Sequence, residues 1–220
     1  MKKRDKPPLG VICTSQLNAT EQNLFPILKK KFRVVFFPLF RDIDYAILKE
    51  QSRDILLLLN TAGDMPHTFD SLEIVKTFEA LGKHVIDSSR SFYYREDKWL
   101  FYHTCLQHAL PTPITYYVPR NISFMKGRLK EILDEDAVVF KGIFSDTGRA
   151  VKRATTYSEA LHVVRELRKK IGIMPIVAQR YIPHGTVSYR VTLAGENIIQ
   201  SVIKYGKIWK EGKLFWKNEK

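Results

Sequence analysis

The sequence predicts two successive structural units, a parallel α/β unit followed by an α+β unit. Residues 1–95 alternate near-continuous apolar strands with helix-like segments, a pattern typical of a parallel sheet with helices on both faces. From Asp97 onward this alternation stops, and the last strands are joined by a tight turn that favours antiparallel pairing. A chain of 220 residues can form one large or two small domains, each with its own core.

The first unit, residues 1–95, contains four expected strands and three expected helices. The strands are Leu9–Cys13, Arg33–Phe37, Asp54–Leu59 and His84–Asp87, and the helices are Thr20–Lys31, Asp44–Gln51 and Ser71–Leu81. Ligands of open parallel sheets bind beyond the carboxyl ends of the strands. We therefore expect the loops Thr14–Asn18 and Asn60–His67 to help form a substrate pocket. The sequence of this unit has no GxGxxG dinucleotide motif.

We expect two subdomains in the second unit, residues 96–175 and 176–220. The expected helices are Lys98–Ala109, Phe124–Leu133 and Ser158–Lys170, and the expected strands are Ile114–Val118, a hairpin around Lys141, Ile176–Ile182, Ser188–Leu193 and Asn197–Lys204. Pro111 and Pro113 end the first helix, because proline cannot continue one. Ser158 is the expected N-cap of the third helix, with Glu159 in its first turn.

Lys141 and the loop after it form the most informative segment. The apolar residues Val138–Phe140 lead into the lysine, and apolar positions resume near Val151, which indicates two short strands joined by a loop. An ammonium at the end of a buried strand is unfavourable unless an anion compensates its charge. Gly142 and Gly148 allow backbone N–H groups to approach a ligand closely. Taken alone, the segment fits a phosphate clamp and an ordinary hairpin with a snorkelling lysine equally well.

Positive charge is concentrated in the second half of the chain. The formal net charge is +13; residues 1–119 carry 16 Lys and Arg against 13 Asp and Glu, and residues 120–220 carry 20 against 10, so the two parts contribute +3 and +10. This asymmetry indicates an acidic partner, which can be nucleotide phosphates, a polycarboxylate substrate or nucleic acid. A solvated basic surface accounts for part of the excess.

Several other classes of protein find no support. No apolar run approaches the roughly 20 residues of a membrane span, and Leu9–Cys13 is too short for a signal-peptide core. Cys13 and Cys105 form no CxxC pair or disulfide framework, which favours a reducing, cytoplasmic setting. His103 and His108 stand at i and i+5 of one expected helix, a spacing that does not suit metal binding, so we expect no metal ligands there.

Four motifs of the second half follow one another in a recognisable order. They are Asp97-Lys98 at the head of a helix, the lysine and glycine loop Val139–Gly148, the strand Ile176–Ile182, and Tyr189-Arg190-Val191. In order and spacing they resemble the ATP-grasp superfamily, most of all the RimK-type, glutamate ligase-like branch of ATP-dependent carboxylate–amine ligases. The resemblance runs from about Leu9 to the end of the chain. It implies a Rossmann-like pre-ATP-grasp domain followed by an ATP-grasp domain whose two subdomains hold ATP between them.

The resemblance also implies roles for individual residues. Lys141 matches the lysine that contacts the ATP phosphates, and Ser145–Gly148 match the glycine-rich cover. Lys98 matches a lysine at the head of the linking helix. Arg190 matches the arginine that faces phosphate and the acyl intermediate, and Lys204 matches a basic residue near the phosphates. The hinge strand whose backbone meets the adenine edge corresponds to Gln179, Arg180, Tyr181 and Ile182.

The implied activity is the ligation of a small carboxylate to an amine. In this family a phosphoryl group from ATP, with Mg²⁺, activates the carboxylate, and an amine then displaces phosphate from the acyl-phosphate. Such phosphoryl transfer depends on positioning and on charge neutralisation by lysine, arginine, backbone amides and magnesium. The implied cofactors are therefore ATP and Mg²⁺.

The chain departs from the family pattern in three places. Arg180 replaces a glutamate, so a donor stands where the family has an acceptor, and Ser188 replaces an aspartate. The family's magnesium carboxylates follow a stretch like Trp209–Asn218, where this sequence ends, so the ATP-grasp domain is incomplete and we expect no metal ligands in it. Three explanations stay open: a portion of a longer ligase, a nucleotide-binding protein without turnover, or a homo-oligomer in which another chain completes the site.

A non-catalytic module that binds nucleotide or nucleic acid is the second hypothesis. Lys204–Lys220 carries six lysines interleaved with Tyr205, Trp209, Phe215 and Trp216. Aromatic residues that stack on bases and lysines that follow phosphates are typical of single-stranded nucleic-acid binding. Lysines that protect an exposed strand edge explain the same composition.

Overall fold

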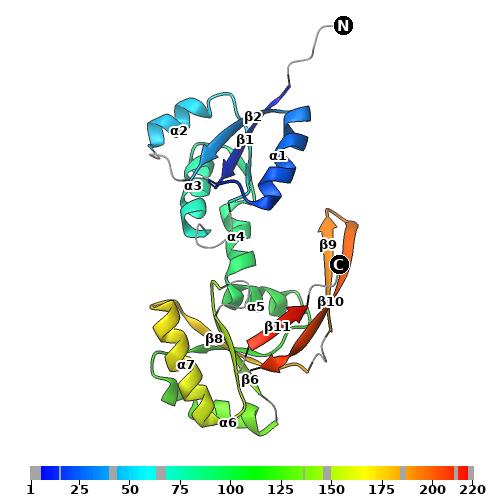
Figure 1. Ribbon diagram of the computed structural model, residues 1–220. Helices are drawn as coiled ribbons and strands as arrows, with labels where there is room; N and C mark the ends of the chain where they lie inside the picture. Colours follow the sequence, from blue (N-terminus) through cyan, green and yellow to red (C-terminus); the bar gives the residue numbers. More distant parts are fainter. Residues whose placement is uncertain are drawn as a thin grey trace. The chain divides into compact units, whose positions relative to one another are not determined.

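The computed structural model divides into two compact units, Met1–Arg95 and Glu96–Lys220 (Figure 1). The structure describes residues 6–14, 16–39, 44–62, 68–135, 137–145, 150–183, 187–210 and 213–217. The predicted mixture of a parallel α/β unit and an antiparallel α+β unit is confirmed.

Unit 1 contains a four-stranded sheet in which all three strand pairs are parallel, in the order β2-β1-β3-β4. The strands are β1 (Pro8–Cys13), β2 (Arg33–Pro38), β3 (Leu57–Asn60) and β4 (His84–Ile86). The helices are α1 (Ala19–Lys31), α2 (Tyr45–Gln51) and α3 (Thr68–Ala80), and α4 (Ser89–Glu96) follows the last strand. Helix α4 was not predicted, because it is short and buries a single residue, Phe92.

The two faces of this sheet have separate cores, because successive side chains of a strand point to opposite sides. On one face, Val11 and Cys13 of β1 pack against Phe25 of α1. On the other face, Ile12 and Leu58 pack with residues of α2 and α3. Figure 1 shows α1 on one side of the sheet and α2 and α3 on the other. Helices on both faces are therefore confirmed.

A buried carboxylate fixes the ends of β1 and β3 to the start of α1. Glu21 is fully buried and accepts hydrogen bonds from the hydroxyls of Thr14 and Thr61, each at 2.7 Å, and from the backbone N–H of Asn18 at 2.9 Å. Asn18 in turn caps α1 by accepting from the Glu21 N–H at 2.9 Å. The hydrogen bonds satisfy a group that would otherwise be strongly unfavourable in the interior.

Unit 2 begins with α5 (Lys98–Gln107) and contains a second four-stranded sheet. Its strands are β5 (Thr115–Val118), β6 (Val138–Gly142), β7 (Val151–Ala154) and β8 (Ile176–Arg180), paired antiparallel in the order β5-β8-β6-β7. A 3₁₀ turn η1 (Ile122–Met125), α6 (Lys126–Glu135) and α7 (Tyr157–Ile171) complete this part. Residues of both helices, Leu129 of α6 and Leu167 of α7 among them, pack against Val138, Phe140 and Ala178 on one face of the sheet.

The N-cap of helix α7 lies two residues before the predicted one. Thr156, not Ser158, is the N-cap, and its hydroxyl accepts from the N–H of Glu159 at 3.2 Å. The Glu159 carboxylate accepts from the Thr155 N–H at 2.7 Å, which completes the first turn. The prediction of Ser158 as the N-cap was therefore wrong. Thr156, two residues earlier, is also a residue type that suits an N-cap.

The third sheet of the structure is antiparallel, in the order β11-β10-β9. Its strands are β9 (Val187–Ala194), β10 (Asn197–Lys210) and β11 (Lys213–Lys217). Strand β11 and the extension of β10 beyond Lys204 were not predicted. The strand at residues 176–180 pairs with β5 and β6, so the change from one sheet to the next falls after β8. None of the helices in the described residue ranges is both long and apolar enough to cross a membrane.

Candidate functional site

The face of the four-stranded sheet that points away from α6 and α7 carries three polar residues that contact one another. Phe140 and Ala178 face the helices, so Lys141 and Gln179, the next residues in each strand, face the other way. The strand register places Gln179 directly opposite Thr115 of β5. Lys141 lies diagonally from Gln179, within reach of a long side chain. The three strands therefore bring these side chains together.

A chain of hydrogen bonds holds the Lys141 ammonium in place. Lys141 Nζ donates to Gln179 Oε1 at 2.6 Å, and Gln179 Nε2 donates to Thr115 Oγ1 at 2.9 Å. Thr115 Oγ1 donates to the carbonyl of Pro113 at 2.9 Å. Because Thr115 receives the amide N–H, the amide oxygen is turned toward the lysine. The sequence predicted Lys141 and Gln179 as site residues but gave Thr115 no role.

Lys98 holds the start of the loop that follows β6. Asp97 caps α5 through the N–H groups of Trp99 and Leu100, each at 2.9 Å, which places Lys98 in the first turn. Lys98 Nζ donates to the carbonyls of Ile143, at 3.0 Å, and Ser145. The Ser145 hydroxyl donates to the Gly142 carbonyl at 2.7 Å. Lys98 and Ser145 are thus brought together, while Gly148 lies outside the described residues.

Two physical effects act on the charge of Lys141. Burial, together with the positive charge of Lys98, lowers the pKa of Lys141 to about 8. Gln179 is a neutral acceptor, so it orients the ammonium without compensating its charge. Two cationic side chains that repel each other across a partly buried face favour an anion between them.

Two backbone N–H groups of the predicted hinge strand already donate hydrogen bonds within the protein. The N–H of Arg180 donates to Ile114 and the N–H of Tyr181 donates to Ala137, each at 2.9 Å. Ile182, which is 51% exposed, follows them. If adenine binds along this strand, the Ile182 backbone is therefore a better candidate for its edge than the N–H groups of Arg180 and Tyr181.

Arg153 is a candidate site residue that the sequence did not reveal. It lies opposite Val139 in the pairing of β6 and β7, on the same face as Lys141. Its guanidinium lies 4.5 Å from the centre of the Tyr181 ring, a cation–π contact. Its Nε is buried and has no hydrogen-bond partner among the described residues. The alternation of side chains along Val151–Ala154 could have placed Arg153 on this face, but only with the register between β6 and β7, which the sequence does not give.

Arg190 and Lys204 lie in the three-stranded sheet, not in the sheet of Lys141. Arg190 of β9 is exposed and pairs with Val202, and Lys204 of β10 pairs with Ser188. The structure therefore places the two predicted catalytic residues on neighbouring strands. It describes the backbone of Lys204 but not its side chain.

The donor set of this face suits an anion and not a metal ion. Within the described ranges, no three His, Cys, Asp or Glu side chains gather closely enough to hold a metal. The side chains on the Lys141 face contribute ammonium, guanidinium, amide and hydroxyl groups. Magnesium prefers carboxylate and water oxygens, so these residues do not form a magnesium site.

Comparison with known proteins identifies the fold. No protein-family model and no curated protein sequence matches this chain. A RimK-domain ATP-grasp protein from Sphaerobacter thermophilus DSM 20745 is 16% identical, with a TM-score of 0.65 over 96% of this chain and 76% of that one. D-alanine–D-alanine ligase from Bacillus anthracis is 15% identical, with a TM-score of 0.67 over 96% and 71%.

A third similar structure was solved with a bound nucleotide. It is N5-carboxyaminoimidazole synthetase from Staphylococcus aureus complexed with ADP, which is 13% identical with a TM-score of 0.61 over 97% of this chain and 57% of that one. At these identities the likeness concerns the fold. The chain has the ATP-grasp fold that the order of its motifs predicts.

Proposed function

We propose that the chain binds ATP on the Lys141 face of unit 2 and acts in the class of ATP-dependent carboxylate–amine ligases. One observation carries the proposal. The ammonium of Lys141 is partly buried, it is held by a neutral amide at 2.6 Å, and Lys98 adds a second cation. No described carboxylate pairs with Lys141, so an anionic ligand is the group that would compensate its charge.

The residues of this face suit the different parts of a nucleotide. Lys141 would contact the phosphates, and Lys98 would hold the loop residues around Ser145 against them. Arg153 offers a buried N–H next to the Tyr181 ring, close to the hinge strand. When bound, ATP supplies the phosphoryl group that activates a carboxylate. The chain's own contribution is to position that group and to neutralise its charge.

The remaining roles rest on the family resemblance. Arg190 and Lys204 would face the phosphates and the acyl intermediate, and the Gln179–Ile182 backbone would meet adenine. Magnesium would need carboxylates other than those of the described residues. A longer chain or a second copy in a homo-oligomer could supply them. The ligase and ADP-bound structures that share the fold support the choice of ATP and of this reaction class.

Calorimetric titration with ATP and Mg²⁺ tests the proposal. We expect wild type to bind, and Lys141→Met to bind at least about tenfold more weakly, because a charge-assisted contact of about 1.5–3 kcal/mol is lost. Lys130→Met, which removes an exposed lysine of α6, is the control and should bind like wild type. Equal affinity in wild type and Lys141→Met, or no binding at all, would reject the assignment.

A second measurement separates the ligase from the nucleic-acid hypothesis. We expect phosphate release from ATP only when a carboxylate and an amine from an amino-acid pool are both present. Salt-dependent binding to random single-stranded oligonucleotides that ATP does not reduce would instead support a nucleic-acid-binding module.

A further inference from the structure

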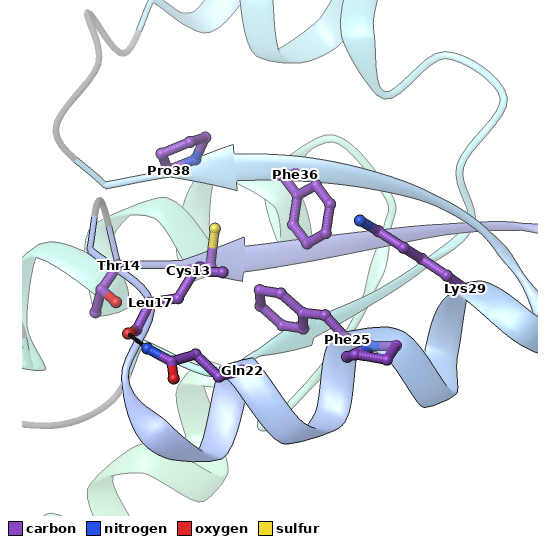
Figure 2. Close-up of a pocket in the computed structure, with 9 residues that line it drawn as sticks. Cys13, Thr14, Leu17, Gln22, Phe25, Lys29, Phe36 and Pro38 are labelled. Atoms are coloured by element: carbon purple, nitrogen blue, oxygen red, sulfur yellow. Dashed lines mark hydrogen bonds between the residues drawn. The ribbon is translucent and has the colours of Figure 1, made fainter.

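A cavity of about 530 Å³ lies between α1 and the edge strand β2 of unit 1. Its lining includes Cys13, Leu17, Phe25, Phe36, Pro38 and Lys29. Figure 2 shows β1 behind the cavity, with Phe25 on the helix and Phe36 on the strand turned toward each other. Thr14 and Leu17, from a loop predicted to form a substrate pocket, lie at one end. The volume lies within the range of small-molecule sites, about 300–1,000 Å³.

The body of the cavity is aromatic and apolar. The rings of Phe25 and Phe36 have their centres 4.8 Å apart and are tilted by 48° to each other. Together they form a continuous aromatic surface against which a flat ring can pack in an offset or edge-to-face arrangement. Cys13, which is 2% exposed, closes the cavity on the side of β1. A ligand of this cavity must therefore have an apolar, planar part.

Lys29 supplies the one full charge of the lining. It lies one helical turn after Phe25, and its ammonium is 5.3 Å from the centre of the Phe36 ring (Figure 2). Among the described residues, no carboxylate forms an ion pair with Lys29. A positively charged ligand would be repelled at this end. A polyphosphate would find a single cation and a mostly apolar wall, which do not balance its charge.

We propose that this cavity binds a small aromatic carboxylate. The ring of the ligand would pack on Phe25 and Phe36, and its carboxylate would lie beside the Lys29 ammonium. The site lies wholly within unit 1 and uses none of the residues of the Lys141 face. It is therefore independent of the proposed function.

Titration of the ¹⁵N-labelled full chain with 3-phenylpropionate, followed by amide chemical shifts, tests this site. We expect saturable shifts at Cys13, Phe25 and Phe36, and about fivefold weaker binding of the neutral 3-phenylpropanamide, since a partly exposed ion pair contributes about 1 kcal/mol. Lys29→Gln should weaken carboxylate binding by the same factor and leave amide binding unchanged. Lys30→Gln, which removes the neighbouring exposed charge, should bind both probes like wild type.

A variant that fills the cavity completes the test. Leu17 is 41% exposed at the cavity, so Leu17→Trp should fold and should abolish the binding of both probes. No saturable shifts in wild type, equal binding of the acid and the amide, or equal losses in Lys29→Gln and Lys30→Gln would overturn the proposal. Shifts at the same amides on dilution without any probe would assign the cavity to a second copy of the chain and would also overturn it.

Discussion

The ammonium of Lys141 lies where burial opposes its charge and Gln179 offers only a neutral acceptor. Burial and, second to it, the charge of Lys98 lower the pKa of Lys141 from 10.5 to about 8. Between these two values the unfolded chain binds more protons than the folded chain, so this residue makes stability rise with pH. Below about pH 8 the folded protein carries the cation at a cost on the order of 3 kcal/mol.

Proton uptake on nucleotide binding follows from this shift. Phosphates raise the pKa of Lys141, so wild type should take up about half a proton per nucleotide near pH 8, and its affinity should weaken from about pH 7 to about pH 9. Lys141→Arg should lack this uptake, because the guanidinium does not titrate in this range. Calorimetry in buffers of different ionisation enthalpy measures the difference. The same uptake in both proteins would show that another group titrates.

Removal of the Arg153 side chain tests the residue that the sequence did not reveal. Its Nε is buried without a described partner, and its guanidinium lies on the Tyr181 ring. We expect Arg153→Leu to weaken ATP binding about tenfold, the value of a charge-assisted hydrogen bond near 1.5 kcal/mol. Arg165→Leu, on an exposed position of α7, should have no effect. Unchanged affinity in Arg153→Leu would exclude the residue from the site.

Among the elements, those with continuous apolar runs could be placed from the sequence. Strands β1, β2 and β6 have such runs because both faces of each are covered or half-covered. Strand β11 could not be placed, because its short apolar run Leu214–Trp216, flanked by lysines, fits several structures equally well. At the candidate site, motif order predicted Lys141 and Gln179, which the structure brings into contact. Arg153 needed the pairing of β7 with β6, which depends on contacts distant in the sequence.

The N-terminus of α7 gives a test at the scale of one element. Thr156 accepts the N–H of Glu159, while Ser158 lies exposed within the first turn. Thr156→Ala should lower the free energy of unfolding by about 1 kcal/mol. Ser158→Ala should change it by less than about 0.5 kcal/mol. Urea unfolding of both variants decides between the observed and the predicted cap, and a larger loss for Ser158→Ala would favour the predicted one.

For the whole molecule, the two units have separate cores and differ in charge. The apolar clusters of the first sheet and those of the second share no residues. Residues 120–220 also carry +10 of the net charge of +13. Affinity for a nucleotide should therefore come from unit 2 and should decrease as salt screens its charges.

Hydrogen exchange with and without ATP and Mg²⁺ examines this division. We expect slower exchange at residues 139–145 and 177–183, where the Lys141 face and the hinge strand lie, and unchanged exchange in β1 and β3. Exchange in unit 1 should respond to 3-phenylpropionate instead. Protection by nucleotide that is confined to unit 1 would contradict the assignment of ATP to unit 2 and of the aromatic carboxylate to unit 1.

The carboxylate of Glu21 has a consequence for the cavity of unit 1. By accepting from Thr14, Asn18 and Thr61, it fixes the two ends of the Thr14–Asn18 loop, which carries Leu17, before any ligand arrives. A ligand that binds beside that loop then has to order little of the backbone, because the chain lost that conformational entropy when it folded. The entropic penalty on binding is therefore small. Loss of this one buried acid would therefore weaken a ligand that it never touches, and the effect would appear as a larger entropic penalty on binding.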